Sequence, residues 1–345
     1  MRVDQIAMLP VFPNMFVQKV RTLLNCYGRK VLTASLALST FAVFGFLIAR
    51  DWDTLQQFEW SLKPSLLILA LCAHAVSLGG TFIAWKLIMR YLGSPVKIEM
   101  DFLFYFLSLA ARKIPSAIWY TGARTFLYTQ EGMSAYFVIS AIAIEFIIAV
   151  LTGGWVFIVF QNRYLFMENY TWVGHGLVML TLLLTIFFLI QPKSIIKWIQ
   201  RRGAEQGRDS PTSFLSRRNL IICSVPYLVA WAIGGTSFYL TIWALIPSPG
   251  IDWFNAVGIA TLSTLIVLIG TILPMGIGLK EIAAGVLLSP WLPVTVGLSV
   301  SVIYRFLQTF DEALWIGLAY SLYLFNSIRH TSRANFPPDN PNGVL

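Results

Sequence analysis

Long runs of apolar residues are the feature that most constrains how this chain can fold. A helix needs about 20 apolar residues to cross about 30 Å of hydrocarbon, so a run of about 18 or more predicts a membrane span. Six such ranges occur: 31–49, 65–89, 134–160, 172–190, 219–246 and 294–326. With 57% hydrophobic and only 12% charged residues, the chain is too apolar for a water-soluble domain. We therefore predict an all-α, polytopic transmembrane bundle.

The apolar runs also set the domain organisation. We expect one transmembrane domain over residues 31–326, a cytoplasmic segment over 1–30, and a cytoplasmic, disordered tail over 327–345. The run 31–49 lacks a small-residue cleavage pattern, so it is interpreted as a retained span. The three cysteines have no ligand-like spacing. We therefore expect neither a disulfide framework nor a metal or other cofactor.

Successive spans must cross the membrane in opposite directions. When the loops are assigned to its two sides in this way, most basic residues lie on one side. Eleven are placed inside: Arg90, Lys97, Lys193, Lys197, Arg201, Arg202, Arg208, Arg217, Arg218, Arg329 and Arg333. Only Arg50, Lys63 and Arg163 are placed outside. This asymmetry predicts cytoplasmic termini and a multi-pass protein of a bacterial cytoplasmic membrane. It also accounts for the net charge of +9, so we expect no nucleic-acid partner.

Two short charged segments, 112–119 and 274–281, break helical structure inside apolar surroundings. Pro115 interrupts the first, and Pro274, Gly276 and Gly278 interrupt the second. Exposed backbone groups cost several kcal/mol each in hydrocarbon, so such breaks are expected to line a polar site. With six spans, the stretches 100–128 and 253–292 each enter and leave by one face. The sequence thus predicts two re-entrant or broken helical hairpins within an inverted repeat, a transporter arrangement.

Charged residues within the apolar runs are the candidates for that site. Ser301, Arg305, Gln308, Thr309 and Glu312 share one face of a helix, whereas Asp311 lies off that face and needs another partner. Glu145 occupies the centre of its run. Its cation could come from Arg305, Lys280 or Arg124. The alternative is a structural ion pair that fixes helix register.

Lys280 and Glu281 follow the second break, at the start of a short helix predicted over 279–289. Helix N-termini suit anionic groups. Glu281 is expected to pair with Lys280 or Arg305. Near the first break, Arg112 and Lys113 either bind ligand or simply snorkel to the cytoplasmic rim. His74 is interpreted as a hydrogen-bonded packing residue and Lys86 as a snorkelling one. The predicted substrate-binding set is Arg112, Lys113, Arg124, Glu145, Lys280, Glu281, Arg305, Gln308 and Glu312.

The broken segments resemble motifs of the lysylphosphatidylglycerol synthase transmembrane family, the flippase-like domain of the bacterial multiple peptide resistance factor. Residues 111–119 are similar to a G-K-[YF]-I-P-G-x-[VI]-W-like segment, and 274–281 to a P-G-G-[LI]-G-[VL]-R-E-like segment. Arg124, Glu145 and Arg305 match further charged positions. Four residues depart from the pattern: Ala111, Ser116 and Met275 replace glycines, and Lys280 replaces arginine. The resemblance implies lipid translocation between leaflets. It does not imply synthase activity, because no aminoacyl-transferase domain follows residue 326.

Together these patterns predict a translocase for a charged amphipathic lipid, either a phospholipid or a polyprenyl-phosphate-linked glycolipid. No P-loop and no H-E-x-x-H motif is present, so we expect no catalytic activity and no ATP hydrolysis by the chain. The alternative is a non-transporting scaffold whose partner is a membrane glycosyltransferase or lipid synthase. A groove that opens to lipid beside the charged residues would favour translocation, and a sealed bundle would favour the scaffold.

Overall fold

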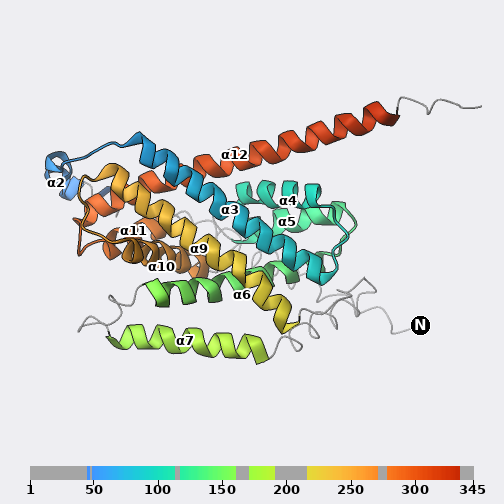
Figure 1. Ribbon diagram of the computed structural model, residues 1–345, viewed down its shortest axis with the longest axis horizontal. Coiled ribbons are helices and arrows are strands. Elements are labelled where there is room, and N and C mark those ends of the chain that lie inside the picture. The colour runs from blue at the N-terminus through green and yellow to red at the C-terminus, as the bar shows by residue number, and fades with distance from the viewer. Residues whose placement is uncertain are drawn as a thin grey trace, which may run out of the picture.

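The computed structural model describes residues 45–46, 49–112, 117–160, 171–190, 216–270 and 278–334. All regular secondary structure within these residues is helical, which confirms the predicted all-α bundle. In chain order the helices are α2 (Trp52–Gln57), α3 (Pro64–Leu92), α4 (Ile98–Ala111), α5 (Ala117–Gln130), α6 (Ala135–Phe160), α7 (Thr171–Ile190), α9 (Arg217–Leu245), α10 (Trp253–Gly270), α11 (Leu279–Leu287) and α12 (Val294–Ala334) (Figure 1).

Three helices of the described chain, α3, α6 and α9, are long and apolar enough to cross a membrane. Their 26 to 29 residues correspond to about 39–44 Å at 1.5 Å per residue, more than the hydrocarbon thickness. Helices also occupy the ranges predicted at 172–190 and 294–326. Helix α12 continues to Ala334, into the range predicted as a tail. Residues 1–30 and most of the predicted span 31–49 lie outside the described residues.

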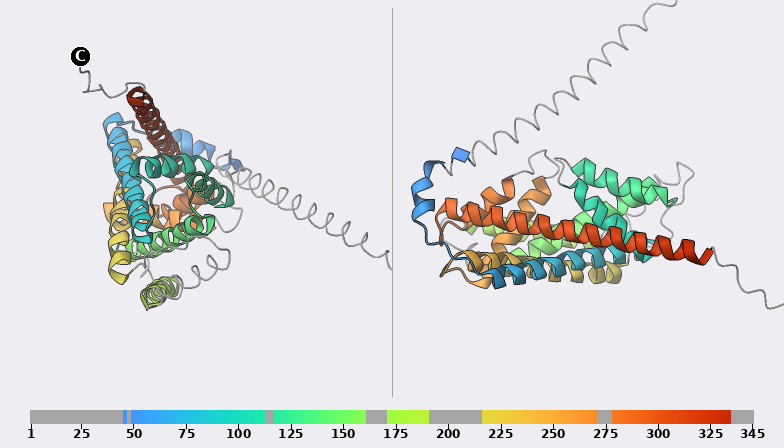
Figure 2. Two further views of the ribbon diagram at one scale, coloured as in Figure 1. Left: turned by 90° about the vertical axis from the view of Figure 1, so that its right-hand side faces the viewer. Right: turned by 90° about the horizontal axis from the view of Figure 1, so that it is seen from above.

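Helices α3 and α9 run side by side along one face of the bundle (Figures 1 and 2). Small residues let their backbones approach closely. A Cβ added to Gly80 would meet the Cβ of Ala230 at 3.3 Å. Ser77 donates a hydrogen bond to the carbonyl of Ala230, and Ser237 donates one to the carbonyl of Ala70, each at 2.7 Å. The pair is therefore joined by close packing and by hydrogen bonds in both directions.

Both predicted hairpins are present as a helix, a break and a second helix. Helices α4 and α5 have 14 residues each, or about 21 Å, and α11 has nine, or about 14 Å. These helices are too short to cross about 30 Å of hydrocarbon. Gly278 precedes α11 with a left-handed backbone (φ 84°), which its lack of a Cβ permits. Pro115, Pro274 and Gly276 lie outside the described residues.

The two hairpins lie at opposite ends of the long axis, and α12 runs past both (Figures 1 and 2). Helix α12 packs on α11 near its start and on α4 further along, where the rings of Phe106 and Trp315 stack with centroids 4.7 Å apart. The order span, hairpin, span occurs twice: α3, α4–α5, α6 and then α9, α10–α11, α12. Helix α12 is thus the element that contacts both hairpins.

Candidate functional site

One face of α12 carries the polar side chains predicted from helical spacing. Arg305 and Gln308 point their polar atoms to α11, and Asp311 and Gln308 contact α3. Ser301 instead donates to the carbonyl of Gly297 at 2.8 Å, within its own helix. The middle of α12 is therefore the meeting point of three helices.

Arg305 and Glu281 form an ion pair between α12 and α11. The guanidinium Nη1 lies 2.6 Å from Oε1 of Glu281. The carboxylate side chain is only 5% exposed, whereas the Arg305 side chain is 38% exposed. Of the two partners expected for Glu281, the structure selects Arg305. The buried carboxylate orients a cation whose side chain is partly exposed on the described bundle.

Lys280 lies beside this pair, in the first turn of α11. Its Nζ donates to Oε1 of Gln308 at 3.0 Å and lies 5.3 Å from the centroid of the Tyr304 ring. The position of Lys280 follows from local structure, because Gly278, with its left-handed backbone, caps α11. The helix then begins at Leu279, one residue before Lys280. Two cationic side chains, Lys280 and Arg305, therefore lie at the contact between α11 and α12, close to the N-terminus of α11.

His74 and Asp311 form a second buried polar pair next to Gln308. The imidazole Nδ1 lies 2.7 Å from Oδ2 of Asp311, and Nε2 lies 3.3 Å from the amide nitrogen of Gln308. The other partner that the sequence required for Asp311 is thus His74. Helical spacing could not identify it, because the two residues are on helices far apart in sequence.

Arg124 and Glu145 form a separate cluster between α5 and α6. Arg124 Nη1 donates to Oε2 of Glu145 at 2.6 Å, and the Tyr227 hydroxyl donates to Oε1 at 2.9 Å. Arg124 is fully buried. Its Nε donates to Ser108 at 3.0 Å, and Trp85 is one of three aromatic rings within 4.3–4.5 Å of its guanidinium carbon. Of the three cations considered for Glu145, the structure selects Arg124.

The end of α4 places one more predicted cation near this cluster. The Arg112 guanidinium lies over the Tyr120 ring, 4.8 Å from its centroid, and the residue is exposed. Glu312 of α12 is half-buried, further along the face that carries Arg305. Lys113 lies outside the described residues. Arg112 is therefore accessible in a way that Arg124 is not.

A polar cluster that the sequence analysis missed joins α3, α4 and α5. Lys86 pairs with the buried Asp101, whose other oxygen accepts from the Tyr128 hydroxyl at 2.7 Å. That hydroxyl accepts from the Trp85 indole at 2.8 Å. Lys86 is thus paired, not snorkelling freely. The sequence signal for this cluster was Asp101 itself, an aspartate within an apolar run, which lies in the first turn of α4.

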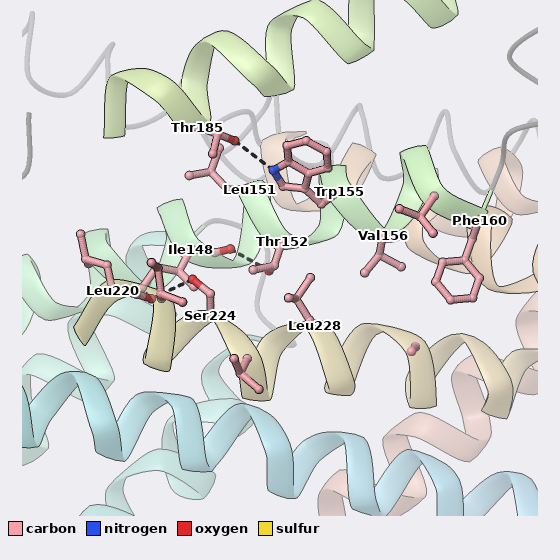
Figure 3. A pocket seen from close by; sticks show the side chains of 14 residues that line it. Ile148, Leu151, Thr152, Trp155, Val156, Phe160, Thr185, Leu220, Ser224 and Leu228 are labelled. Atoms are coloured by element: carbon pink, nitrogen blue, oxygen red, sulfur yellow. Dashed lines mark hydrogen bonds between the residues drawn. The ribbon is translucent and has the colours of Figure 1, made fainter. Parts of the chain in front are cut away.

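The described residues contain no group of three or more His, Cys, Asp or Glu side chains that could hold a metal ion. They do contain an apolar groove of about 520 Å³ between α6, α7 and α9 (Figure 3). Ile148 and Ser224 line it, one helical turn from Glu145 and Tyr227 respectively. Its hydroxyls are satisfied locally: Thr152 and Ser224 donate to carbonyls of their own helices. The groove therefore suits a hydrocarbon chain, and neither Lys280 nor Arg305 lines it.

Residues 32–311 match the sequence model of a family described as the lysylphosphatidylglycerol synthase TM region. The match covers most of the chain. It includes both broken hairpins and both ion pairs, Arg124 with Glu145 and Arg305 with Glu281. The chain belongs to this family. No curated protein matches the chain closely enough to count as a relative. Membership of the lysylphosphatidylglycerol synthase TM family makes this a membrane protein linked to membrane lipids. It confirms the family resemblance carried by the two broken segments.

Proposed function

We propose that the protein translocates an anionic or zwitterionic lipid between membrane leaflets, without chemical change to the lipid and without ATP hydrolysis by the chain. The observation that carries this proposal is the Arg305–Glu281 pair beside Lys280 at the start of a half-helix. Membrane sites for anionic substrates are commonly built from such half-helix N-termini. The membrane is proposed to be the bacterial cytoplasmic membrane, with both termini on its cytoplasmic side.

Arg305 is suited to hold a phosphate while it stays paired. A guanidinium carries five N–H donors in a planar fork, and the bond to Glu281 uses one of them. Phosphates accept two parallel N–H bonds from such a fork. The buried Glu281 fixes the arginine, so less side-chain freedom is lost when lipid binds. The partly exposed side chain of Arg305 is the proposed headgroup contact.

Lys280 adds a second positive charge to the same region. The N-terminus of α11 contributes about 0.3–1 kcal/mol when exposed and up to about 2 kcal/mol when partly buried. That is small beside a direct hydrogen bond to a charged group, worth about 1.5–3 kcal/mol. Lys280 and Arg305 should therefore dominate recognition, with Gln308 and Glu281 positioning them.

The first hairpin is proposed to serve the opposite leaflet. Arg112 is exposed at the tip of α4, so it is the headgroup contact there, with Lys113 and Glu312 as its neighbours in the proposal. Arg124 and Glu145 are buried, so we assign them to holding α5 on α6. The substrate is either an aminoacyl phospholipid or a polyprenyl-phosphate-linked sugar, both of which pair a charged headgroup with long apolar chains. The groove beside Ile148 and Ser224 can accept such a chain.

Purified full-length protein in liposomes provides the test. Labelled aminoacyl phosphatidylglycerol and labelled polyprenyl-phosphate sugars are placed in both leaflets and quenched from outside. Wild-type protein should expose the inner-leaflet label of one lipid class to the quencher. Arg305→Ala and Lys280→Ala should slow this at least tenfold. Arg90→Ala is the matched control, because Arg90 is exposed in the last turn of α3, and its rate should equal wild type.

A membrane scaffold is the second candidate function. The observation that favours it is the closed Arg124–Glu145 cluster, whose opposite buried charges pair with each other inside the bundle. A scaffold would bind a glycosyltransferase or lipid synthase and move no lipid. Equal quenching in wild-type, variant and protein-free vesicles for every lipid would refute translocation and leave this second candidate.

A further inference from the structure

The apolar groove between α6, α7 and α9 lies apart from the charged residues at α11 and α12. Leu220 lies at one of its ends and Phe160 at the other (Figure 3). The Trp155 indole donates to the Thr185 hydroxyl at 3.1 Å, which joins α6 to α7 along the groove. Like the Ser224 hydroxyl, this indole is thus satisfied by the protein itself. The groove therefore calls for an occupant that is apolar along its length.

The dimensions of the groove select hydrocarbon over a protein helix. On α9 the lining residues run from Leu220 to Ala232, or about 18 Å at 1.5 Å per residue. A helix of this length and about 10 Å in diameter would occupy about 1,400 Å³. The groove has a volume of about 520 Å³. A partner's transmembrane helix therefore cannot fill it, whereas the narrower chain of a lipid can.

Two arginines continue the groove-lining face of α9 beyond Leu220. Ser216 caps this helix, accepting a hydrogen bond from a backbone N–H of the first turn at 3.2 Å. Arg217 and Arg218 therefore occupy the first turn, and both are exposed. Arg217 precedes the groove-lining Leu220 by three residues, and Arg218 precedes Ile221 by three, a spacing that places them on one face. Long helical side chains lean towards the helix N-terminus, so both guanidinium groups extend past this end of the groove.

The opposite end of the groove is aromatic. There the Phe160 ring packs against the rings of Trp253 and Phe254, with centroids 5.2 and 5.6 Å apart. The groove thus has a cationic end and an apolar end. An occupant with one anionic end and a long apolar body matches both.

The depth of these residues in the membrane gives the same order. Helix α9 has 29 residues, or about 44 Å, which exceeds about 30 Å of hydrocarbon by about 14 Å. If the excess is shared between its ends, about four to five residues project from the hydrocarbon at each end. Arg217 and Arg218 then lie at headgroup depth, and the groove from Leu220 onwards lies at acyl-chain depth. A phospholipid has its phosphate and its chains at these same two levels.

We propose that the groove and the two arginines form a binding site for an anionic phospholipid of the cytoplasmic leaflet. One acyl chain lies in the groove, and the phosphate binds Arg217 and Arg218. Guanidinium groups bind phosphate through paired N–H bonds, and basic residues beside a membrane helix attract anionic lipid. The site is separate from Lys280 and Arg305. It goes beyond the proposed function, because it holds lipid whether or not the protein moves lipid.

Photolabelling of the full-length protein tests this site. Protein in detergent is titrated with phosphatidylglycerol that carries a diazirine in one acyl chain, and labelled peptides are identified by mass spectrometry. Wild-type protein should show saturable labelling within residues 148–160 and 220–232. Unlabelled phosphatidylglycerol should compete, and phosphatidylcholine of the same chain length should compete at least fivefold more weakly, because each cation near an anionic lipid is worth roughly fivefold in binding. Glycerol phosphate, which has no chain, should not compete.

Charge variants test the phosphate contact. Arg217→Gln/Arg218→Gln should lower the affinity for phosphatidylglycerol about fivefold or more, to that for phosphatidylcholine. Arg90→Gln/Lys97→Gln is the matched control, because it removes the same charge from exposed positions on the same predicted side of the membrane. An unchanged preference for phosphatidylglycerol in the Arg217/Arg218 variant, or an equal loss in the control, would overturn the phosphate contact.

A groove-filling variant tests the chain contact. Ser224→Phe should abolish labelling of the groove by both lipids, whereas Val229→Phe, at an exposed position of α9 that does not line the groove, should behave as wild type. Leu228→Phe is a second groove variant, and thermal unfolding checks the fold of each. Groove labelling that does not saturate, or that survives both substitutions, would overturn the site. Competition by glycerol phosphate would show a site for free phosphate and would also overturn it. Because photolabelling requires no transport, absence of lipid movement in liposomes would refute translocation and leave this site standing.

Discussion

The Arg124–Glu145 pair offers the sharpest energetic test of the fold. Glu145→Gln is nearly isosteric and removes only the negative charge, which leaves the fully buried guanidinium of Arg124 without its anion. Breaking one side of a buried ion pair costs about 3–5 kcal/mol. The Trp85, Tyr105 and Tyr120 rings lie 4.3–4.5 Å from the guanidinium carbon. Desolvated cation–π contacts reach about 2 kcal/mol, so we place the loss near 3 kcal/mol.

Removing both charges should cost much less than either single change. In the double variant Glu145→Gln/Arg124→Met, the methionine fills apolar space and the glutamine keeps a hydrogen-bond acceptor for Tyr227. Replacement of a whole buried pair is often close to neutral. We expect the double variant to unfold within about 1.5 kcal/mol of wild type. The corresponding coupling energy is at least about 2 kcal/mol.

The assay is reversible unfolding in bicelles or mixed micelles, followed by far-ultraviolet circular dichroism. The four proteins of the cycle are compared with Glu99→Gln, because Glu99 is exposed in the first turn of α4 and should contribute no more than about 1 kcal/mol. Additive losses in the double variant, or single variants as stable as wild type, would refute the closed-cluster interpretation of these two residues.

Two further predictions concern packing and orientation. Gly235→Ala should destabilise the protein by about 1–3 kcal/mol, because the added Cβ would lie 2.7 Å from the Cα of Val257 on α10 and backbone cannot give way cheaply. Gly79→Ala, with no atom within 4 Å of its added Cβ, is the control, and equal unfolding free energies for the two variants would contradict this packing. Cysteines at Glu59 and Glu131, both exposed, should label from opposite sides of the membrane in a background without native cysteines. An impermeant maleimide added to cells should reach position 59 and not 131. Labelling of 131 from outside would reverse the proposed orientation.

Much of the candidate site could be located from sequence, although the choice among the partners considered for each carboxylate could not be made. Lys280 and Glu281 were placed at a helix start by the preceding glycines, and α11 begins at Leu279 as predicted. Glu145 was identified because an isolated carboxylate in an apolar run demands a cation. The choice of Arg124 over Lys280 and Arg305 came only from the structure.

His74 shows what sequence reasoning could supply and what it could not. A single histidine among alanine, cysteine and valine was interpreted as a hydrogen-bonded packing residue, and both of its ring nitrogens do have partners, but only the structure shows that these partners lie on α12. Asp101 was missed altogether, and its pairing with Lys86 depends on how α4 turns back beside α3. Neither contact leaves a local pattern, because the partners are joined across helices and not along one.

The sequence by itself determined the helices, their breaks and which residues were too polar for their surroundings. These are local properties, because a backbone in hydrocarbon must satisfy its own hydrogen bonds. The apolar runs indicate where a helix does so, and Gly and Pro indicate where the helix is interrupted. The tertiary structure alone decided which charges meet. Pairing depends on the rotation of each helix about its axis and on the register between neighbours, which close contacts such as Gly80 against Ala230 fix. No spacing within a single helix contains that information, so Arg305 with Glu281 and His74 with Asp311 emerge only from the packed bundle.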